Sequence, residues 1–322
     1  MKAQRINALI VFILFLVPNV NFGQAPDLGA ASSFALFTAN GAFNNVGATS
    51  VIGDVGTNAG VFNAFPPGTV DGQIHVTNST SGLAATAVLA AYNDLEGRTG
   101  GTVISTTLEG QSLTPGLYDL GAAASLNGNL TLNGGGDPNA LFIIQIDGAL
   151  LIGASITSTV TLVNSASLCN VYWQIGGQFD LGAGSVFRGT AVVKDAINLL
   201  EGSSLLGRGL STAGAITLNN NIVNFVPAAA GAITGTTTVC QGQAGVSYSV
   251  PVIAEAASYS WTLPTGATGT SSTNSITVNY GVSAVSGTIT VKGNNSCGGD
   301  GTASTLAITV NPLPLTSAIY HQ

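Results

Sequence analysis

The sequence predicts a mostly β protein in two parts, a solenoid of stacked coils followed by a second β domain. A three-residue unit recurs within the first part: FDL at 179–181, INL at 197–199 and ITL at 216–218, in steps of 18 and 19 residues. Each unit is followed by a Gly- or Asn-rich corner and another short apolar run. Strand-like content at a period close to that of the shorter solenoid repeats is typical of a β-helix.

The composition supports many short strands joined by tight turns. The chain has 322 residues, enough for two domains, and 43 of them are glycine. Charged residues make up only 7% of the chain, against about 25% in an average domain. Because 45% of the residues are apolar, a disordered protein is excluded.

The charge pattern excludes two classes of partner. Lys and Arg together total 7, they form no basic run, and the formal net charge is −7. A nucleic-acid-binding surface needs clustered basic residues that neutralise phosphates, so nucleic acid is not an expected partner. The acidic, charge-poor surface also disfavours binding to anionic membranes.

The N-terminal segment 1–24 is typical of a cleaved secretory signal. Lys2 and Arg5 precede an apolar core at 8–17, and Gly23 supplies a small residue near the expected cleavage site. The core is too short to span a bilayer, and no other apolar run is long enough to do so. We therefore expect a secreted, extracellular protein without membrane insertion.

One segment of the predicted β-helix domain (25–226) has a helical pattern instead. Residues 81–98 are rich in alanine and contain no proline, and their apolar positions recur at helical spacing. Ser81 is expected to cap the start of this helix and Gly97 to end it.

The second domain follows a change in composition. An Ala-, Gly- and Pro-rich segment at 227–235 is interpreted as a linker. Residues 236–312 contain alternating strands that turn signals separate at the intervals of a β-sandwich. The tail at 313–322 has no folded element, and we expect it to lead toward a further module or an attachment signal.

The three cysteines leave one unpaired if a disulfide forms, and export makes a disulfide possible. We expect Cys240 and Cys297 to pair and to staple the second domain, which would contribute about 2–4 kcal/mol. Cys169 lies in an apolar context and is expected to be a buried free thiol. Trp261 is expected in the core of the sandwich, and Trp173 in the core of the β-helix.

Three motifs resemble the microbial ice-binding protein family. They are LTPGLY at 113–118, CNVYWQIG at 169–176 and FRGT at 187–190, and the similarity covers roughly 27–226. The resemblance implies a right-handed β-helix of triangular section with one long α-helix packed alongside. Residues 231–312, with SYSW at 258–261, resemble the PKD-like, Ig-type modules of Bacteroidota surface and secreted proteins, which implies an Ig-like β-sandwich.

The resemblance implies adsorption to ice through one flat face of the β-helix. Neighbouring coils lie about 4.7–4.9 Å apart, so equivalent side chains form ordered rows. The family often carries Thr-Ala/Gly-x-Thr/Asn at its coil corners. The corners here are 152–155, 183–186, 201–204 and 219–222; three keep the central Gly, none keeps the leading Thr, and Glu201 adds a charge.

The candidate ice-binding residues are small polar side chains at or near these corners. The alternative for each is an ordinary turn residue, because Gly, Ser and Asn suit tight corners. The candidates are Asn127, Asn129, Ser155, Ser185, Ser203 and Ser204.

Three functions remain open, and the leading one is a secreted protein that adsorbs to ice and inhibits its growth and recrystallisation. The second is a non-catalytic adhesive or structural surface protein with the same fold. The third is a glycan-active enzyme, which would need clustered carboxylates, whereas Asp147, Asp180 and Asp195 are scattered among neutral residues.

No nucleophile–base pattern and no metal-ligand spacing is present in the sequence. We therefore predict no catalytic residue, no metal and no cofactor. The expected partner is the surface of an ice crystal, the protein is expected to be monomeric, and attachment to a cell surface through the C-terminal region is an open alternative.

Overall fold

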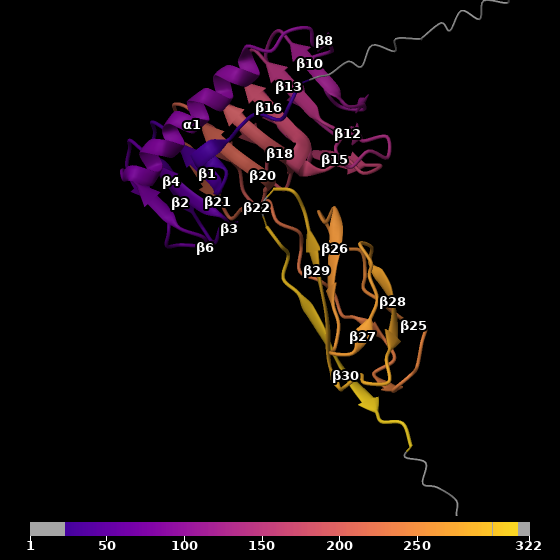
Figure 1. Cartoon of the computed structure of the whole chain (residues 1–322). Coiled ribbons are helices and arrows are strands. Elements are labelled where there is room, and N and C mark those ends of the chain that lie inside the picture. Colours follow the sequence, from indigo (N-terminus) through magenta and orange to yellow (C-terminus); the bar gives the residue numbers. More distant parts are fainter. Residues whose placement is uncertain (1–22, 298, 315–322) are drawn as a thin grey trace, which may run out of the picture.

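The structure is a computed structural model that describes residues 23–297 and 299–314 (Figure 1). It contains a β-helix with one long helix alongside, followed by a smaller β-sandwich, which confirms the predicted fold class. Most of the predicted signal at 1–24 and of the predicted tail at 313–322 lies outside the described residues. Within the described part, no helix is long and apolar enough to cross a membrane.

The β-helix has three faces, each built of parallel strands, which we call faces A, B and C. Face A consists of β1 (Phe34–Thr38), β4 (Asp54–Thr57), β7 (Ile74–Val76), β8 (Thr102–Val103), β10 (Gly116–Leu120), β13 (Phe142–Ile146), β16 (Val171–Ile175) and the second halves of β18 (Val186–Val193) and β20 (Ser204–Ser211).

Face B is a separate seven-stranded sheet, and face C joins face A through the long strands β18 and β20. Face B consists of β11 (Ala124–Leu126), β14 (Leu150–Ile152), β17 (Phe179–Leu181), β19 (Ile197–Leu199), β21 (Ile216–Asn219), β2 (Phe43–Val46) and β5 (Phe62–Asn63). Face C consists of β9 (Ser112–Leu113), β12 (Asn129–Asn133), β15 (Thr159–Val163), the first halves of β18 and β20, β22 (Ile222–Asn224), β3 (Ser50–Ile52) and β6 (Thr69–Asp71).

The predicted repeat is confirmed. Its three units are β17, β19 and the first three residues of β21, and they pair in parallel with Phe179 beside Ile197 and Ile197 beside Ile216. The apolar first and third residues of each unit are buried, and the central residue points outward. This is the alternation that a strand with one buried side requires.

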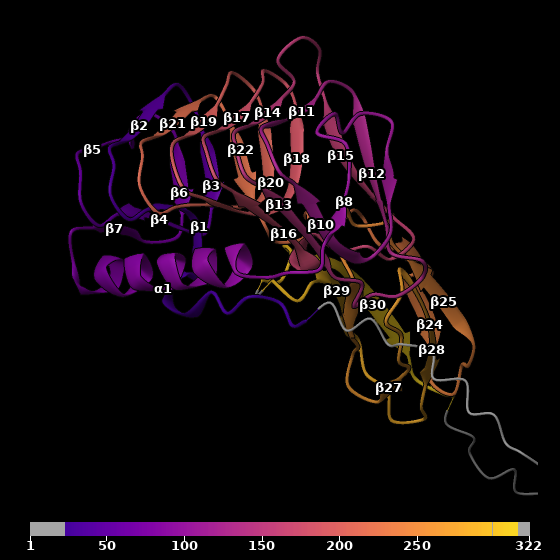
Figure 2. The same cartoon turned by 90° about the horizontal axis from the view of Figure 1, so that it is seen from above.

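The coils do not stack in sequence order. The N-terminal coil, formed by β1, β2 and β3, pairs with β20, β21 and β22 of the last coil. After two N-terminal coils and β7, helix α1 (Ser79–Glu96) carries the chain back along the β-helix, and β8 starts the coil at the other end (Figure 2). The two N-terminal coils therefore extend the β-helix beyond the coil of β20, β21 and β22, which comes last in the sequence.

Helix α1 begins one turn earlier than the predicted cap implies. Asn78 is the N-cap and accepts from the Ser81 backbone N–H at 2.9 Å, while the Ser81 hydroxyl accepts from the Asn78 N–H at 2.8 Å, forming a capping box. Ser81 therefore lies inside the first turn, and Gly97 ends the helix as predicted.

Face A is covered by α1. Ala84, Val88 and Leu95 of the helix pack against outward-facing side chains of face A, including Ile143 and Tyr172. This burial on both sides explains why β13 and β16 are apolar except for one glutamine each. Helix α1 therefore covers the middle of face A, while side chains of the end strands β7 and β8 remain exposed.

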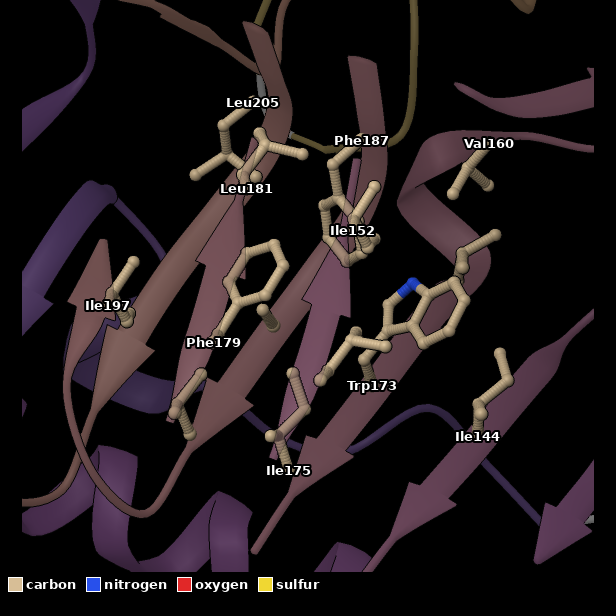
Figure 3. Close-up of a cluster of buried hydrophobic side chains, with 14 of the residues drawn as sticks. Ile144, Ile152, Val160, Trp173, Ile175, Phe179, Leu181, Phe187, Ile197 and Leu205 are labelled. Atoms are coloured by element: carbon tan, nitrogen blue, oxygen red, sulfur yellow. The ribbon is translucent and has the colours of Figure 1, made fainter. Parts of the chain in front are cut away.

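The interior of the β-helix is an apolar core around Trp173, Phe179 and Phe187 (Figure 3). The ring centroids of Trp173 and Phe187 lie 5.2 Å apart, and those of Phe179 and Phe187 lie 4.8 Å apart. The Trp173 Nε1–H donates to the Arg188 carbonyl oxygen at 3.1 Å. The predicted core position of Trp173 is confirmed.

The sandwich has two four-stranded sheets, and Trp261 packs, half-buried, against the core between them. One sheet consists of β23 (Thr234–Gly235), β25 (Val246–Ser249), β28 (Ser275–Tyr280) and β27 (Ala267–Thr268). The other consists of β24 (Thr238–Cys240), β30 (Ser304–Asn311), β29 (Gly287–Asn294) and β26 (Ser258–Thr262).

The predicted disulfide is wrong. Cys297 pairs with Cys169 of the β-helix, and Cys240 is an exposed free thiol. The topology gives the reason: Cys240 lies beside Asn311 at the far end of β30, whereas Cys297 lies in the loop between β29 and β30 at the opposite end. That loop contacts the β-helix, so the disulfide joins the two domains.

Further polar contacts fasten the sandwich to the β-helix. The Arg188 Nε donates to the Glu255 Oε1 at 2.9 Å, and the Arg208 Nη2 donates to the Cys297 carbonyl oxygen at 2.7 Å. Burial lowers the pKa of Arg208 to about 10, so its guanidinium stays protonated at neutral pH. Its charge lies 4.0 Å from the centre of the Phe225 ring.

Candidate functional site

Face B is an uncovered, regular surface. Six intervals between its seven strands make it about 29 Å long at the usual strand spacing. Helix α1 lies on the opposite side of the β-helix, and the sandwich extends away from face B (Figure 2). Face B therefore combines length with free access from solvent.

The second residue of each face B strand points outward, and together these residues form a row that we call the middle row. Successive members are paired in register across the whole sheet. Most of them carry a hydroxyl or an amide. In spatial order they are Ser125, Leu151, Asp180, Asn198, Thr217, Asn44 and Asn63.

A second row of smaller residues runs beside the middle row, two positions earlier in each coil. Its backbone carbonyls accept hydrogen bonds from the strand of the preceding coil, at 2.8–2.9 Å, which fixes it in the same register. Four of its six members are alanine. In spatial order they are Ala149, Gln178, Ala196, Ala215, Ala42 and Val61.

The two rows contain one ionised side chain, Asp180. Its Oδ1 accepts from Asn198 Nδ2 at 2.7 Å and its Oδ2 from Gln178 Nε2 at 2.8 Å. The carboxylate is thus held within the rows rather than extended into solvent. A shallow depression of about 330 Å³ lies beside it, between Asp180, Asn198 and Thr217 on one side and Leu200 and Val46 on the other.

This arrangement suits a repetitive ligand rather than a single small molecule. Hydroxyl, amide and methyl groups recur at a fixed spacing on a rigid sheet, and no deep pocket interrupts them. Many weak contacts made at once give strong adsorption even where each one is small. Such a surface can order a layer of water.

The six residues predicted from the corners do not belong to the strands of face B. Asn127 and Ser155 lie at the corner between faces B and C, where the Asn127 Oδ1 accepts from the Ser155 N–H at 3.0 Å. Asn129 and Ser204 point outward from face C, in one row through Thr159 and Val186.

The prediction for Ser185 and Ser203 is wrong, because both side chains are 0% exposed and cannot touch an external surface. Each follows a left-handed glycine, Gly184 or Gly202, which turns the chain so that the serine points into the corner. The Ser185 Oγ accepts from the Ser158 N–H at 3.0 Å, and the Ser203 Oγ accepts from Asn221 Nδ2 at 2.9 Å.

The middle row of face B was missed, although part of its signal is visible in the repeat. The centres of the units at 179–181, 197–199 and 216–218 are Asp180, Asn198 and Thr217, and a polar residue between two buried ones points outward from a strand. The family motif lies at the corners, so resemblance to the family predicts corner residues rather than the centres of the strands.

No side-chain cluster suited to metal binding is present in the described part of the chain. Among residues 23–297 and 299–314, no three His, Cys, Asp or Glu side chains converge as metal ligands. Asp180 accepts from two side-chain amides, and Asp195 accepts from the N–H of Ala196 at 2.9 Å.

Comparison with known proteins agrees with this geometry. Residues 37–224 match the family described as ice-binding-like, and residues 226–308 match the PKD-like domain. The first match spans more than half of the chain, so the protein belongs to the ice-binding-like family.

Relatives of the β-helix domain come from distant organisms. An ice-binding protein from Nostoc sp. (strain HG1) is 36% identical over 200 residues, covering 61% of this chain and 73% of its own. The crystal structure of an ice-binding protein from the Antarctic ascomycete Antarctomyces psychrotrophicus is 33% identical with a TM-score of 0.59, and 62% of this chain and 98% of that chain are covered. One from an Antarctic Flavobacteriaceae bacterium is 39% identical with a TM-score of 0.58, covering 69% and 54% respectively.

Proposed function

We propose that this protein binds ice through face B and thereby inhibits ice growth and recrystallisation. The proposal rests on the two in-register rows that cross the sheet of face B. Together these rows contain one ionised side chain, Asp180. Relatives over the same domain are named ice-binding proteins. The regular spacing supports adsorption to a periodic surface by many weak contacts.

Ice binding needs no catalysis, and we propose that the protein has none. We also propose that it is exported and acts as a monomer outside the cell. The expected signal at 1–24 and the disulfide between the domains support export, because disulfides persist in oxidising compartments. The proposed β-helix domain at 25–226 and sandwich at 236–312 are supported by the family matches at 37–224 and 226–308, of which the second also includes the expected linker at 227–235.

Thr217→Tyr tests the assignment of face B. Thr217 is in the middle row between Asn198 and Asn44, so a tyrosine ring there holds the sheet away from ice. We expect the variant to lose more than about half of its thermal hysteresis, because the neighbouring contacts are lost together. Nanolitre osmometry and a recrystallisation assay on the purified chain measure this loss.

Ser204→Tyr is the matched control, because Ser204 points outward from face C, where the corner motif placed the site. We expect it to retain hysteresis. Retention in Thr217→Tyr together with loss in Ser204→Tyr would move the site to face C. A wild-type protein without hysteresis at high concentration would contradict ice binding and favour an adhesive or structural role.

A further inference from the structure

A set of fully or nearly buried polar side chains lines the inside of the corner between faces B and C. They come from successive coils, and each is at most 7% exposed. Polar groups are rarely buried in this number unless they bond one another. We call this set the corner ladder; its members are Ser158, Ser185, Ser203, Asn221, Thr49 and Asn45.

Side-chain hydrogen bonds link neighbouring coils at both ends of the corner ladder. At one end, the Gly128 N–H donates to the Ser158 Oγ at 2.9 Å and the Ser158 N–H donates to the Ser185 Oγ at 3.0 Å. Between the ends, the Ser204 N–H donates to the Ser185 carbonyl oxygen at 2.8 Å.

The other end continues through Asn221 and Thr49. Asn221 donates from Nδ2 to the Ser203 Oγ at 2.9 Å and from its backbone N–H to the Thr49 Oγ1 at 3.1 Å. The Thr49 hydroxyl donates to the Asn45 Oδ1 at 2.7 Å, and Asn45 Nδ2 donates at 3.0 Å to the carbonyl oxygen of Ala64, which follows β5 in the second N-terminal coil. The ladder therefore spans nearly the length of face B.

The corner needs such a ladder because its loops differ in length. Only Asn127 and Gly128 join β11 to β12, whereas residues 153–158 join β14 to β15. Loops of unequal length cannot pair with one another as strands do, so their backbone groups need other partners. The ladder side chains supply several of those partners and join neighbouring coils at both ends of this corner, and backbone hydrogen bonds join the coils of Ser185 and Ser203 between them.

We propose that the corner ladder residues are positioning residues of the ice-binding face. They touch no ice, but they hold the ends of the face B strands at an even spacing, and the rows match a lattice only while that spacing is kept. Ser185 and Ser203 would thus act through the strands beside them rather than as contacts. This inference rests on the proposed function and assigns a role to residues inside the fold.

Thr49 offers the sharpest test, because it both accepts from Asn221 and donates to Asn45. Thr49→Val keeps the shape of the side chain and removes the hydroxyl, leaving a buried donor and a buried acceptor without their partner. Thr49→Ser keeps the hydroxyl and removes a methyl group. If thermal hysteresis depends on the ladder, it should fall when the hydroxyl is removed in Thr49→Val. If it depends on core packing, it should fall when the methyl group is removed in Thr49→Ser.

Val88→Ala is the control for a general loss of stability. Val88 is 0% exposed and packs from α1 against face A, away from the corner ladder. We expect Val88→Ala and Thr49→Val to lower the melting temperature by several degrees each. Thermal hysteresis is measured near 0 °C, and circular dichroism at that temperature checks that all variants are folded. Only Thr49→Val should lose most of its thermal hysteresis, and Thr49→Ser and Val88→Ala should retain theirs.

Full hysteresis in Thr49→Val would overturn the inference, and so would an equal loss in Val88→Ala. Loss in Thr49→Ser to the level of Thr49→Val would also overturn it, because the hydroxyl would then not be the group that matters. An inactive wild-type protein would contradict the proposed function itself, and Thr217→Tyr tests the face independently of the ladder.

Discussion

The surface chemistry of face B depends most on Asp180, because it is the one ionised side chain in the two rows. Asn198 and Gln178 each donate to one of its carboxylate oxygens. A carboxylate retains water more firmly than a hydroxyl or an amide does, so it weakens a surface that must match ice. The amide partners reduce this effect without removing the charge.

Asp180→Asn should therefore raise thermal hysteresis at neutral pH. The replacement is nearly isosteric, and the neighbouring amides can reorient to donate and accept, so the free energy of unfolding should change by no more than about 1 kcal/mol. Hysteresis and thermal unfolding of the two proteins at equal concentration check this. A fall in hysteresis with unchanged stability would show that the carboxylate itself contributes to the surface.

The individual residues also show where prediction from the sequence ends. Ser185 and Ser204 both lie within two residues of a corner glycine and look equally exposed in the sequence, yet one is buried and the other faces solvent. The difference is one of position: Ser204 pairs beside Val186, the residue after Ser185, and successive residues of a strand point to opposite sides. The hydrogen bond that Ser185 accepts from the Ser158 N–H inside the corner is not visible in composition or period.

At the scale of elements, local sequence patterns predicted the long helix and the repeated strands. The Ala-rich helix and the strands β17, β19 and β21 follow from helical spacing and from the repeat. The stacking of β1 on β20 does not, because its partners Leu36 and Gly209 are far apart in sequence. A period shows that coils stack, but it carries no information about which end receives the N-terminal coils.

Helix α1 stabilises the β-helix from face A, and its N-cap provides a test at this scale. Asn78→Ala removes the acceptor for the Ser81 N–H. We expect a loss of about 1 kcal/mol in the free energy of unfolding, typical of a lost N-cap. Because α1 and face B lie on opposite sides, hysteresis near 0 °C should not change. Chemical denaturation measures the free energy of unfolding, and osmometry measures the hysteresis. An unchanged free energy of unfolding or a reduced hysteresis would contradict the prediction.

At the scale of the whole molecule, the sandwich is fastened to the β-helix rather than tethered by a loose segment. The Cys169–Cys297 disulfide, the Arg188–Glu255 ion pair and the contact of Arg208 with Cys297 meet at one junction. The segment that follows β22 is also held, since the Ala228 N–H donates to the Ala254 carbonyl oxygen at 3.0 Å. This junction leaves face B free.

The disulfide could not be predicted from sequence because Cys169 and Cys297 belong to different domains and are 128 residues apart. Cys240 and Cys297 share a domain, which made them the simpler pair. Only the fold shows that Cys240 lies at the end of the sandwich remote from the β-helix, beside Asn311.

Replacing each cysteine separately tests the junction. Cys297→Ser should cost about 2–5 kcal/mol, as the loss of a native disulfide commonly does, and should speed proteolysis near 226–233, because the sandwich is then held by polar contacts alone. Cys240→Ser should change neither property, since that thiol is exposed and free. Both variants should keep their hysteresis, because every strand of face B belongs to the β-helix. Equal destabilisation by Cys240→Ser would contradict the pairing, and a loss of hysteresis in Cys297→Ser alone would mean that the sandwich helps to hold the face in its active form.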